Sequence, residues 1–226
     1  GMQRDYAYHS ARHLADLEDA EAIGRRAGER AVARLNPVKP ESGRMAVIFD
    51  PRVSTSLLGH FAGAISGAAI ARQTSFLLGK LGERVFAPGV TIRDDPHRVR
   101  GLRSRPFDGE GLPTRVMDLV EEGVLKSWLA ESASARQLGI APTGHATRGT
   151  SGAPGASVSN LTLQPGSRSR EELLRSVPRA ILVTELIGQG VNGVTGDYSR
   201  GASGFLVSGG EIGAAVSEIT IAGNLI

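Results

Sequence analysis

The chain has 226 residues, and its 26 Lys and Arg against 23 Asp and Glu leave a formal net charge of only +3. Hydrophobic residues at 40% and charged residues at 22% are ordinary proportions for a folded globular protein. The small basic excess and the 4% of aromatic residues do not favour a nucleic-acid partner. The sequence has no cysteine, no evident signal peptide and no membrane-spanning stretch, so we expect a cytoplasmic protein without disulfides, thiolate metal ligands or a membrane segment.

Helical signals dominate the first 42 residues. Residues 13–35 are rich in Ala, Arg and Glu and carry apolar residues at helical spacing, until Asn36 and Pro37 interrupt the pattern. Residues 44–49 form a short apolar run between a glycine and an Asp-Pro pair, which predicts a strand. We therefore expect a helical segment over residues 1–42 and the start of a domain at residue 43.

Residues 43–226 predict an α+β domain, in which a mostly antiparallel β region with short helices follows the N-terminal helices. Residues 53–72 predict a single helix, because their apolar residues fall on one broad face. Residues 115–121 and 124–129 predict a hairpin. The other predicted strands are 90–93, 158–163, 180–187, 204–207 and 211–221, and the other predicted helices are 132–138 and 170–176.

Residues 143–157 are rich in Gly, Ser, Thr and Pro and show no periodicity, which predicts a long loop. Long loops at a protein surface often carry function. We therefore expect Thr143, Gly144 and His145, at the start of this loop, to face a bound peptide or a partner protein.

The sequence contains one formal dinucleotide-binding pattern, G-x-G-x-x-G, at residues 188–193. This pattern must be followed by a helix, because the N-terminus of that helix holds the pyrophosphate. Residues 194–201 (VTGDYSRG) cannot open a helix. We therefore expect a glycine-lined turn between two strands and no nucleotide site.

Arginines and acidic residues are interleaved over residues 93–110. The acidic ones are Asp94, Asp95, Asp108 and Glu110, and five arginines lie among them. A solvated loop in which these charges pair with one another is the favoured interpretation. An anion or carboxylate clamp made from the arginine forks is the alternative.

The predicted helix over 53–72 looks like a metalloprotease helix without its metal ligands. A zinc helix of this type needs two His side chains about one turn apart and a neighbouring Glu as general base. The stretch offers His60 alone, and no acidic residue lies between Asp50 and Glu83. We expect no metal site to be assembled from this stretch.

The same predicted helix carries a stripe of small residues, because Gly59, Gly63 and Gly67 recur every four positions. Glycine costs about 1 kcal/mol relative to alanine at an interior helix position, so three of them suggest that some interaction offsets the loss. Such a stripe lets another backbone approach closely. Packing on a sheet is the favoured interpretation. A peptide or partner that passes Gly63 and Gly67 is the alternative.

Six sequence blocks together resemble one family. They are MQRDY (2–6), VIFDPR (47–52), DDP (94–96), RSRPFDGEG (103–111), VTELIGQGVN (183–192) and GDYSRGASGF (196–205). The blocks resemble the TldD/PmbA family, historically called modulators of DNA gyrase, and within it the PmbA/TldE branch. The resemblance covers essentially all 226 residues. It implies that the chain is a fragment, because family members have an N-terminal domain before the position of Met2 and a further segment after that of Ile226.

The resemblance implies one half of a heterodimeric protease. In this family a TldD-type subunit carries a His-Glu-x-x-x-His helix and pairs with a TldE-type subunit to cleave unfolded peptides. Compared with that helix, this chain has Gly59 at the first His, His60 at the Glu and Ala64 at the second His. The resemblance therefore implies a subunit with no catalytic residues, no metal and no cofactor of its own, and zinc held by a TldD-type partner.

Two alternatives stay open at this stage. One is a stand-alone peptide-binding or regulatory protein of the gyrase-modulator type, without proteolytic activity and paired with a second copy of itself when isolated. A DNA-directed protein would show salt-dependent DNA affinity, which the net charge of +3 does not favour.

Overall fold

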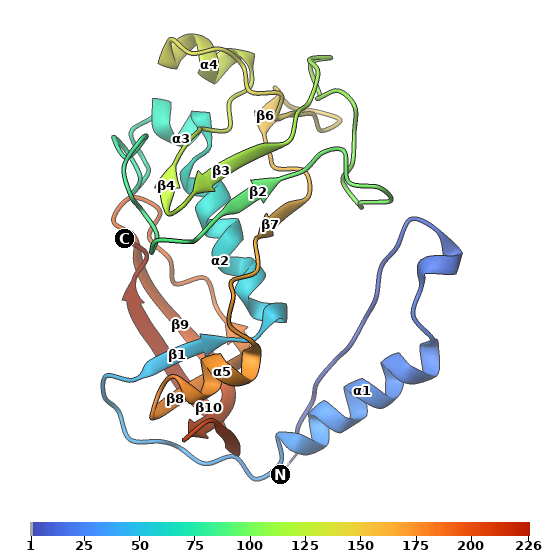
Figure 1. The fold of residues 1–226 in the computed structure, drawn as a ribbon, viewed down its shortest axis with the longest axis vertical. Coiled ribbons are helices and arrows are strands. Elements are labelled where there is room, and N and C mark those ends of the chain that lie inside the picture. Colours follow the sequence, from blue (N-terminus) through green and yellow to red (C-terminus); the bar gives the residue numbers. More distant parts are fainter. Residues whose placement is uncertain (1) are drawn as a thin grey trace. The chain divides into compact units, whose positions relative to one another are not determined.

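The computed structural model describes residues 2–226, which fall into two compact units (Figure 1). Unit 1 comprises residues 2–55, 167–191 and 198–223, and unit 2 comprises residues 56–166, 192–197 and 224–226. Both units combine helices with mostly antiparallel strands, which confirms the predicted α+β class. Among residues 2–226, every helix is too short or too polar to cross a membrane.

Unit 1 is built on a four-stranded sheet with the order β1-β8-β9-β10. β1 is parallel to β8, whereas β9 is antiparallel to β8. Gly209 and Gly210, both with positive φ, form the tight turn between β9 and β10. The bounds are η1 (Leu14–Asp16), α1 (Ala20–Ala33), β1 (Ala46–Phe49), α2 (Pro51–Ala64, which continues into unit 2), α5 (Arg170–Arg175), β8 (Arg179–Ile187), β9 (Asp197–Ser208) and β10 (Glu211–Asn224).

Alternation along β8 sends its side chains to two separate apolar clusters. Leu182 packs with Leu174 of α5 on one face of the sheet. Ile181 and Val183 pack with Val53 of α2 on the other face. Because both faces are covered, this part of the strand is apolar without interruption.

Helix α1 begins later than the sequence predicts. Asp19 caps it by accepting a hydrogen bond from the Ala22 amide at 2.9 Å. Residues 14–16 form only a 3-10 turn, and no residue of α1 is buried. The apolar residues at 14 and 17 suited a helical pattern, but the Asp19 cap fixes the start at residue 20.

Unit 2 contains a second four-stranded sheet, with the order β4-β3-β2-β7 and antiparallel neighbours throughout. Its core includes Ile65, Leu119 and Trp128, the single tryptophan of the chain. The bounds are α3 (Gly67–Ala71), β2 (Ile92–Asp94), β3 (Met117–Glu121), β4 (Val124–Leu125), α4 (Ser132–Leu138), β5 (Ala146–Thr147), β6 (Gly155–Ala156) and β7 (Leu161–Leu163).

The single helix predicted over 53–72 is wrong, because the chain breaks between α2 and α3. The buried Ile65 accepts a hydrogen bond from the Leu129 amide at 2.9 Å, so its carbonyl is satisfied from outside the helix. The Ser66 side chain then accepts from the Ala69 amide at 3.3 Å and caps α3. Apolar periodicity continues across the break, so the pattern could not show it.

Strand lengths differ from prediction where the strand is not apolar. The strand predicted over 204–207 extends over Asp197–Ser208, because its glycine- and serine-rich first half gives no apolar signal. The strand predicted over 124–129 ends at Leu125. The predicted turn at 188–193 is confirmed, since β8 ends at Ile187 and β9 follows.

Gly67 is buried just after the break between α2 and α3. An added Cβ at Gly67 would lie 2.4 Å from Ser134 Oγ and 3.1 Å from the Leu129 carbonyl oxygen. We expect Gly67→Ala to lower the free energy of unfolding of unit 2 by about 1–3 kcal/mol, because the start of α4 must move to admit the methyl group. Urea unfolding followed by Trp128 fluorescence measures the change. Gly59→Ala is the matched control: a Cβ at Gly59 meets nothing within 4 Å, so we expect a gain of up to about 1 kcal/mol. Equal losses for the two variants would contradict this account.

Candidate functional site

Helix α2 carries the three positions that the resemblance aligns with ligand, base and ligand. Gly59 is exposed, His60 is half-buried and Ala64 is buried. Neither Gly59 nor Ala64 has a group that can bind a metal, and α2 contains no acidic residue. Within residues 2–226, no group of three or more His, Asp or Glu side chains is placed to hold a metal ion. The residues present at α2 therefore do not fit a zinc site.

The glycine stripe divides into a buried part and an exposed part. Gly67 packs against the unit's own α4, as described above. Gly59 and Gly63 are exposed, and a Cβ at either position meets no atom within 4 Å. Packing on a sheet, which the sequence favoured, is therefore wrong for Gly59 and Gly63. Their backbone lies on an open surface of α2, where a second chain can come close.

Thr143, Gly144 and His145 are buried, which corrects the prediction that they face a peptide or a partner. Only 9% of Thr143 and 2% of His145 is exposed. Gly144 has a φ of +76°, and an added Cβ would lie 2.8 Å from the Pro113 carbonyl oxygen. The predicted loop over 143–157 contains the β5–β6 ladder. Its composition indicated a surface loop, but hydrogen bonds hold its start inside unit 2.

A buried polar network fixes this segment. His145 Nε2 lies 3.3 Å from Asp94 Oδ2, and His145 Nδ1 lies 2.8 Å from Thr143 Oγ1. Asp94 also accepts hydrogen bonds from the Ser159 amide at 2.8 Å and the Ser159 hydroxyl at 2.9 Å. Thr143 Oγ1 in turn accepts from the Ala130 amide at 2.8 Å. The Asp-His-Thr order is that of a proton relay, but with every member buried we assign it to holding residues 143–159 on β2.

Asp94 is ionised in this network. Its burial acts to raise its pKa, but hydrogen bonds from His145 and from the Ser159 amide and hydroxyl outweigh that effect, and the pKa is lowered. A carboxylate with this many donors stabilises the fold as long as it carries its charge.

The interleaved charged residues over 93–110 do not all lie at the surface and pair with one another. Asp108 is buried and accepts hydrogen bonds from the Glu110, Leu112 and Ala146 amides at 2.9–3.1 Å. Asp94 is buried as well, whereas Arg93 forms a surface ion pair with Asp118 at 2.7 Å. The favoured interpretation is therefore wrong for Asp94 and Asp108, which organise the backbone.

A second buried charge cluster lies in unit 1. The Asp5 side chain is only 1% exposed and accepts hydrogen bonds from Arg52 Nη1 at 2.5 Å and Nη2 at 3.1 Å. Arg34 approaches Asp5 at 3.4 Å and also bonds to Glu185. Burial acts to raise the pKa of Asp5, but the bonds from Arg52 and the Tyr6 amide outweigh it, and the pKa is lowered.

Sequence reasoning missed both clusters as sites, although a signal was present. Asp5, Arg52 and Glu185 lie in three of the six blocks that carry the family resemblance, and Asp94 and Asp108 lie in two others. These blocks are far apart in sequence, and nothing in periodicity or spacing indicates that their charged residues meet.

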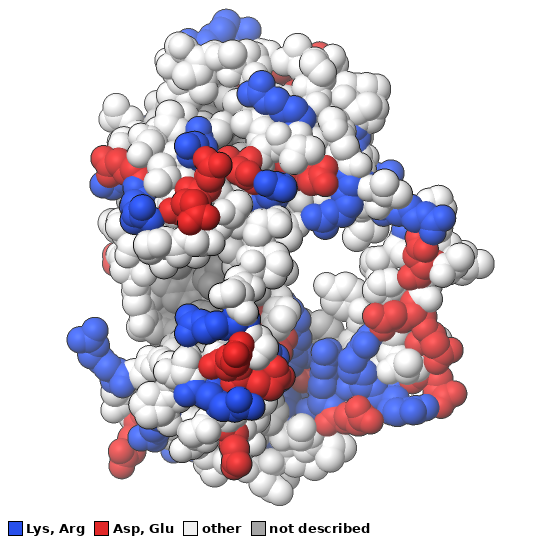
Figure 2. Space-filling model, in the orientation of Figure 1, with Lys and Arg blue, Asp and Glu red and all other residues white. Residues whose placement is uncertain are grey.

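On the face of the molecule shown in Figure 2, positive and negative side chains are interleaved. A protein that binds nucleic acid through its phosphates gathers Lys and Arg into a continuous basic surface. The charges on this face do not favour such a partner.

Asp94→Asn should lower the free energy of unfolding of unit 2 at pH 7 by about 1.5–3 kcal/mol, because hydrogen bonds to a buried charge are lost. The folded-state pKa is lowered, so this stabilisation is present above the ordinary aspartate pKa of about 3.9 and is lost as the pH falls through the folded-state pKa. Urea unfolding followed by Trp128 fluorescence at pH 7, 5, 4 and 3 measures the difference. Asp118→Asn, at a surface pair, should cost at most about 1 kcal/mol. A deficit for Asp94→Asn that grows toward low pH would refute this assignment.

Comparisons with known proteins support the family resemblance that the six sequence blocks indicate. Residues 42–226 match the family model described as the PmbA/TldA metallopeptidase C-terminal domain. Metalloprotease PmbA of Escherichia coli O157:H7 is 44% identical over 224 residues, which are 99% of this chain and 48% of that protein. The crystal structure of TldE from Thermococcus kodakarensis is 30% identical with a TM-score of 0.83, and the match covers 93% of this chain and 48% of that one.

A Thermotoga maritima protein, described as a proposed modulator of a DNA gyrase, is 39% identical with a TM-score of 0.86, and the match covers 95% of this chain and 49% of that one. This chain therefore spans about half the length of the curated relatives it matches. The family model covers most of this chain, and the similarity to PmbA extends over nearly all of it. This chain belongs to the PmbA/TldD metallopeptidase family.

Proposed function

We propose that this chain acts as the PmbA/TldE-type subunit of a TldD/TldE-type metalloprotease that cleaves unfolded peptides, and that it has no metal site of its own. One observation carries the proposal. Gly59, His60 and Ala64 lie on α2 at the positions that the family resemblance aligns with the ligand, base and ligand of a TldD-type helix, and neither Gly59 nor Ala64 has a side chain that can bind a metal. Relatives named metalloprotease PmbA and TldE support the same assignment.

The two subunits would have different roles in this protease. The TldD-type partner supplies zinc and the hydrolytic chemistry. This chain supplies surface, and the exposed backbone at Gly59 and Gly63 is its candidate for close contact with the partner or with an extended peptide. The absence of cysteine suits assembly in a reducing compartment such as the cytoplasm.

Reconstitution with the TldD-type subunit of the same genome tests the proposal. A fluorescein-labelled unfolded peptide should stay intact with this chain alone, with or without zinc, and should be cleaved when both subunits are present. A chelator, or loss of the first His in the partner's helix, should stop cleavage, whereas His60→Ala in this chain should not. Size-exclusion chromatography with light scattering should detect a 1:1 heterodimer.

Zinc-dependent cleavage by this chain alone would refute the proposal. Peptide binding by a monomer or homodimer, with no effect of the partner, would favour the stand-alone binding protein instead. Gly63→Leu tests the contact surface within the same assay. The bulky side chain should reduce cleavage by the pair about tenfold or more, because it blocks close approach to the helix backbone. Ala133→Leu, at an exposed position of α4, is the matched control and should leave cleavage unchanged.

A further inference from the structure

Unit 1 contains a pocket of about 300 Å³ to which none of the assignments above gives a role. Its apolar lining includes Leu182 of β8, Phe205 of β9 and Ile212 of β10, so the sheet supplies an apolar floor. A volume at the lower end of the range for small-molecule sites suits a ligand of one or two amino-acid residues and not a long peptide.

One wall of this pocket is formed by two oppositely charged side chains that bind each other. Asp5 and Arg52 both line it, and their side chains, 1% and 16% exposed, are committed to each other. The Arg52 guanidinium also lies over the Tyr6 ring, 5.7 Å from its centroid. The pair therefore makes a fixed polar wall with nearly balanced charge, and neither residue is the main group to hold a ligand.

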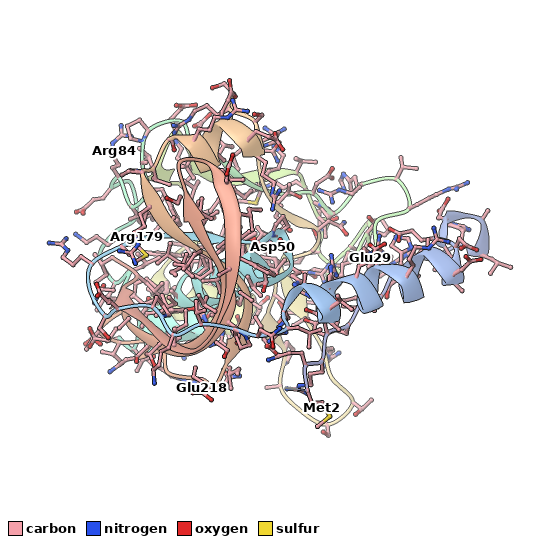
Figure 3. The ribbon with its side chains drawn as sticks, turned by 90° about the horizontal axis from the view of Figure 1, so that it is seen from below. Met2, Glu29, Asp50, Arg84, Arg179 and Glu218 are labelled. Atoms are coloured by element: carbon pink, nitrogen blue, oxygen red, sulfur yellow. The ribbon has the colours of Figure 1, made fainter. Side chains whose placement is uncertain are left out.

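Three other charged groups in the pocket can meet a ligand. Glu29 of α1 and Arg170 of α5 line it, and within residues 2–226 neither side chain forms a hydrogen bond or ion pair. Asp50 lines it too; one of its oxygens accepts from the Arg52 amide at 3.2 Å, so the other can meet a ligand. Figure 3 shows Glu29 on α1 and Asp50 close to the middle of the view, with Arg179 on the opposite side of Asp50 from Glu29.

We propose that this pocket binds a small zwitterion with an aliphatic side chain, either a free α-amino acid or a dipeptide. Glu29 and Asp50 receive the ammonium group, and the Arg170 guanidinium holds the carboxylate with its planar fork. The aliphatic side chain rests on Leu182 and Phe205. The site involves none of the α2 motif positions, so the proposal stands apart from the proteolytic function.

Calorimetric titration of the 226-residue chain with four probes tests the ligand class. L-Leucine or Leu-Leu should bind, and whichever binds more tightly shows whether the site takes one residue or two. N-acetyl-leucine lacks the ammonium and leucinamide lacks the carboxylate, so each should bind at least about tenfold more weakly than leucine. Equal affinity for leucine and its two blocked forms, or no binding of leucine or Leu-Leu at roughly 10 mM, would overturn the proposal.

Single-residue variants assign the two ends of the ligand. Arg170→Gln should weaken leucine binding about tenfold and abolish the preference over leucinamide, whereas Glu29→Gln should abolish the preference over N-acetyl-leucine. Arg179→Gln and Glu211→Gln remove the same charges from exposed residues of unit 1 outside the pocket and should change neither preference. Circular dichroism checks that all four variants fold. If Arg179→Gln and Glu211→Gln weaken leucine binding as much as Arg170→Gln and Glu29→Gln do, the effect comes from the overall charge of the protein and the proposal fails.

Discussion

Unit 1 depends on the contact between Asp5 and Arg52. It ties the N-terminal segment to the first turn of α2, and Arg34 extends it to Glu185 on β8. The Asp5 side chain is buried, so loss of one arginine would leave a desolvated charge without its partner, which is far more costly than loss of a surface pair. The same pair forms a wall of the pocket that we assign to a zwitterion, so the geometry of that pocket rests on it.

Helix α2 connects the fold to the functional proposal. It begins at the Asp50 cap, where the Val53 and Ser54 amides bond to the Asp50 carbonyl, and it ends at Ala64 before the break. Between these points Gly59 and Gly63 are exposed, and as glycines they present only backbone to the surface. A helix with this surface suits contact with another chain and has too few ligands for metal chemistry.

The elements that sequence predicts well are those whose apolar pattern is local. Helix α4 was predicted with its observed bounds, Ser132–Leu138, and the uninterrupted apolar run of β8 was predicted as a strand. The break at Ser66 was missed because the residues on either side of it, Ile65 and Gly67, form backbone hydrogen bonds with Leu129, more than sixty residues away. The burial of His145 was missed for the same reason, since the partner that holds it is Asp94. Composition and periodicity describe neighbours in sequence, and these contacts join distant segments.

Zinc content is the most direct test of the claim that this chain is the subunit without a metal site. The pair with a TldD-type subunit would be reconstituted with zinc, dialysed and separated, and the metal in each subunit measured by mass spectrometry. The account predicts about one zinc per TldD-type subunit and less than about 0.1 per copy of this chain. One zinc per copy of this chain, lost on His60→Ala, would contradict it.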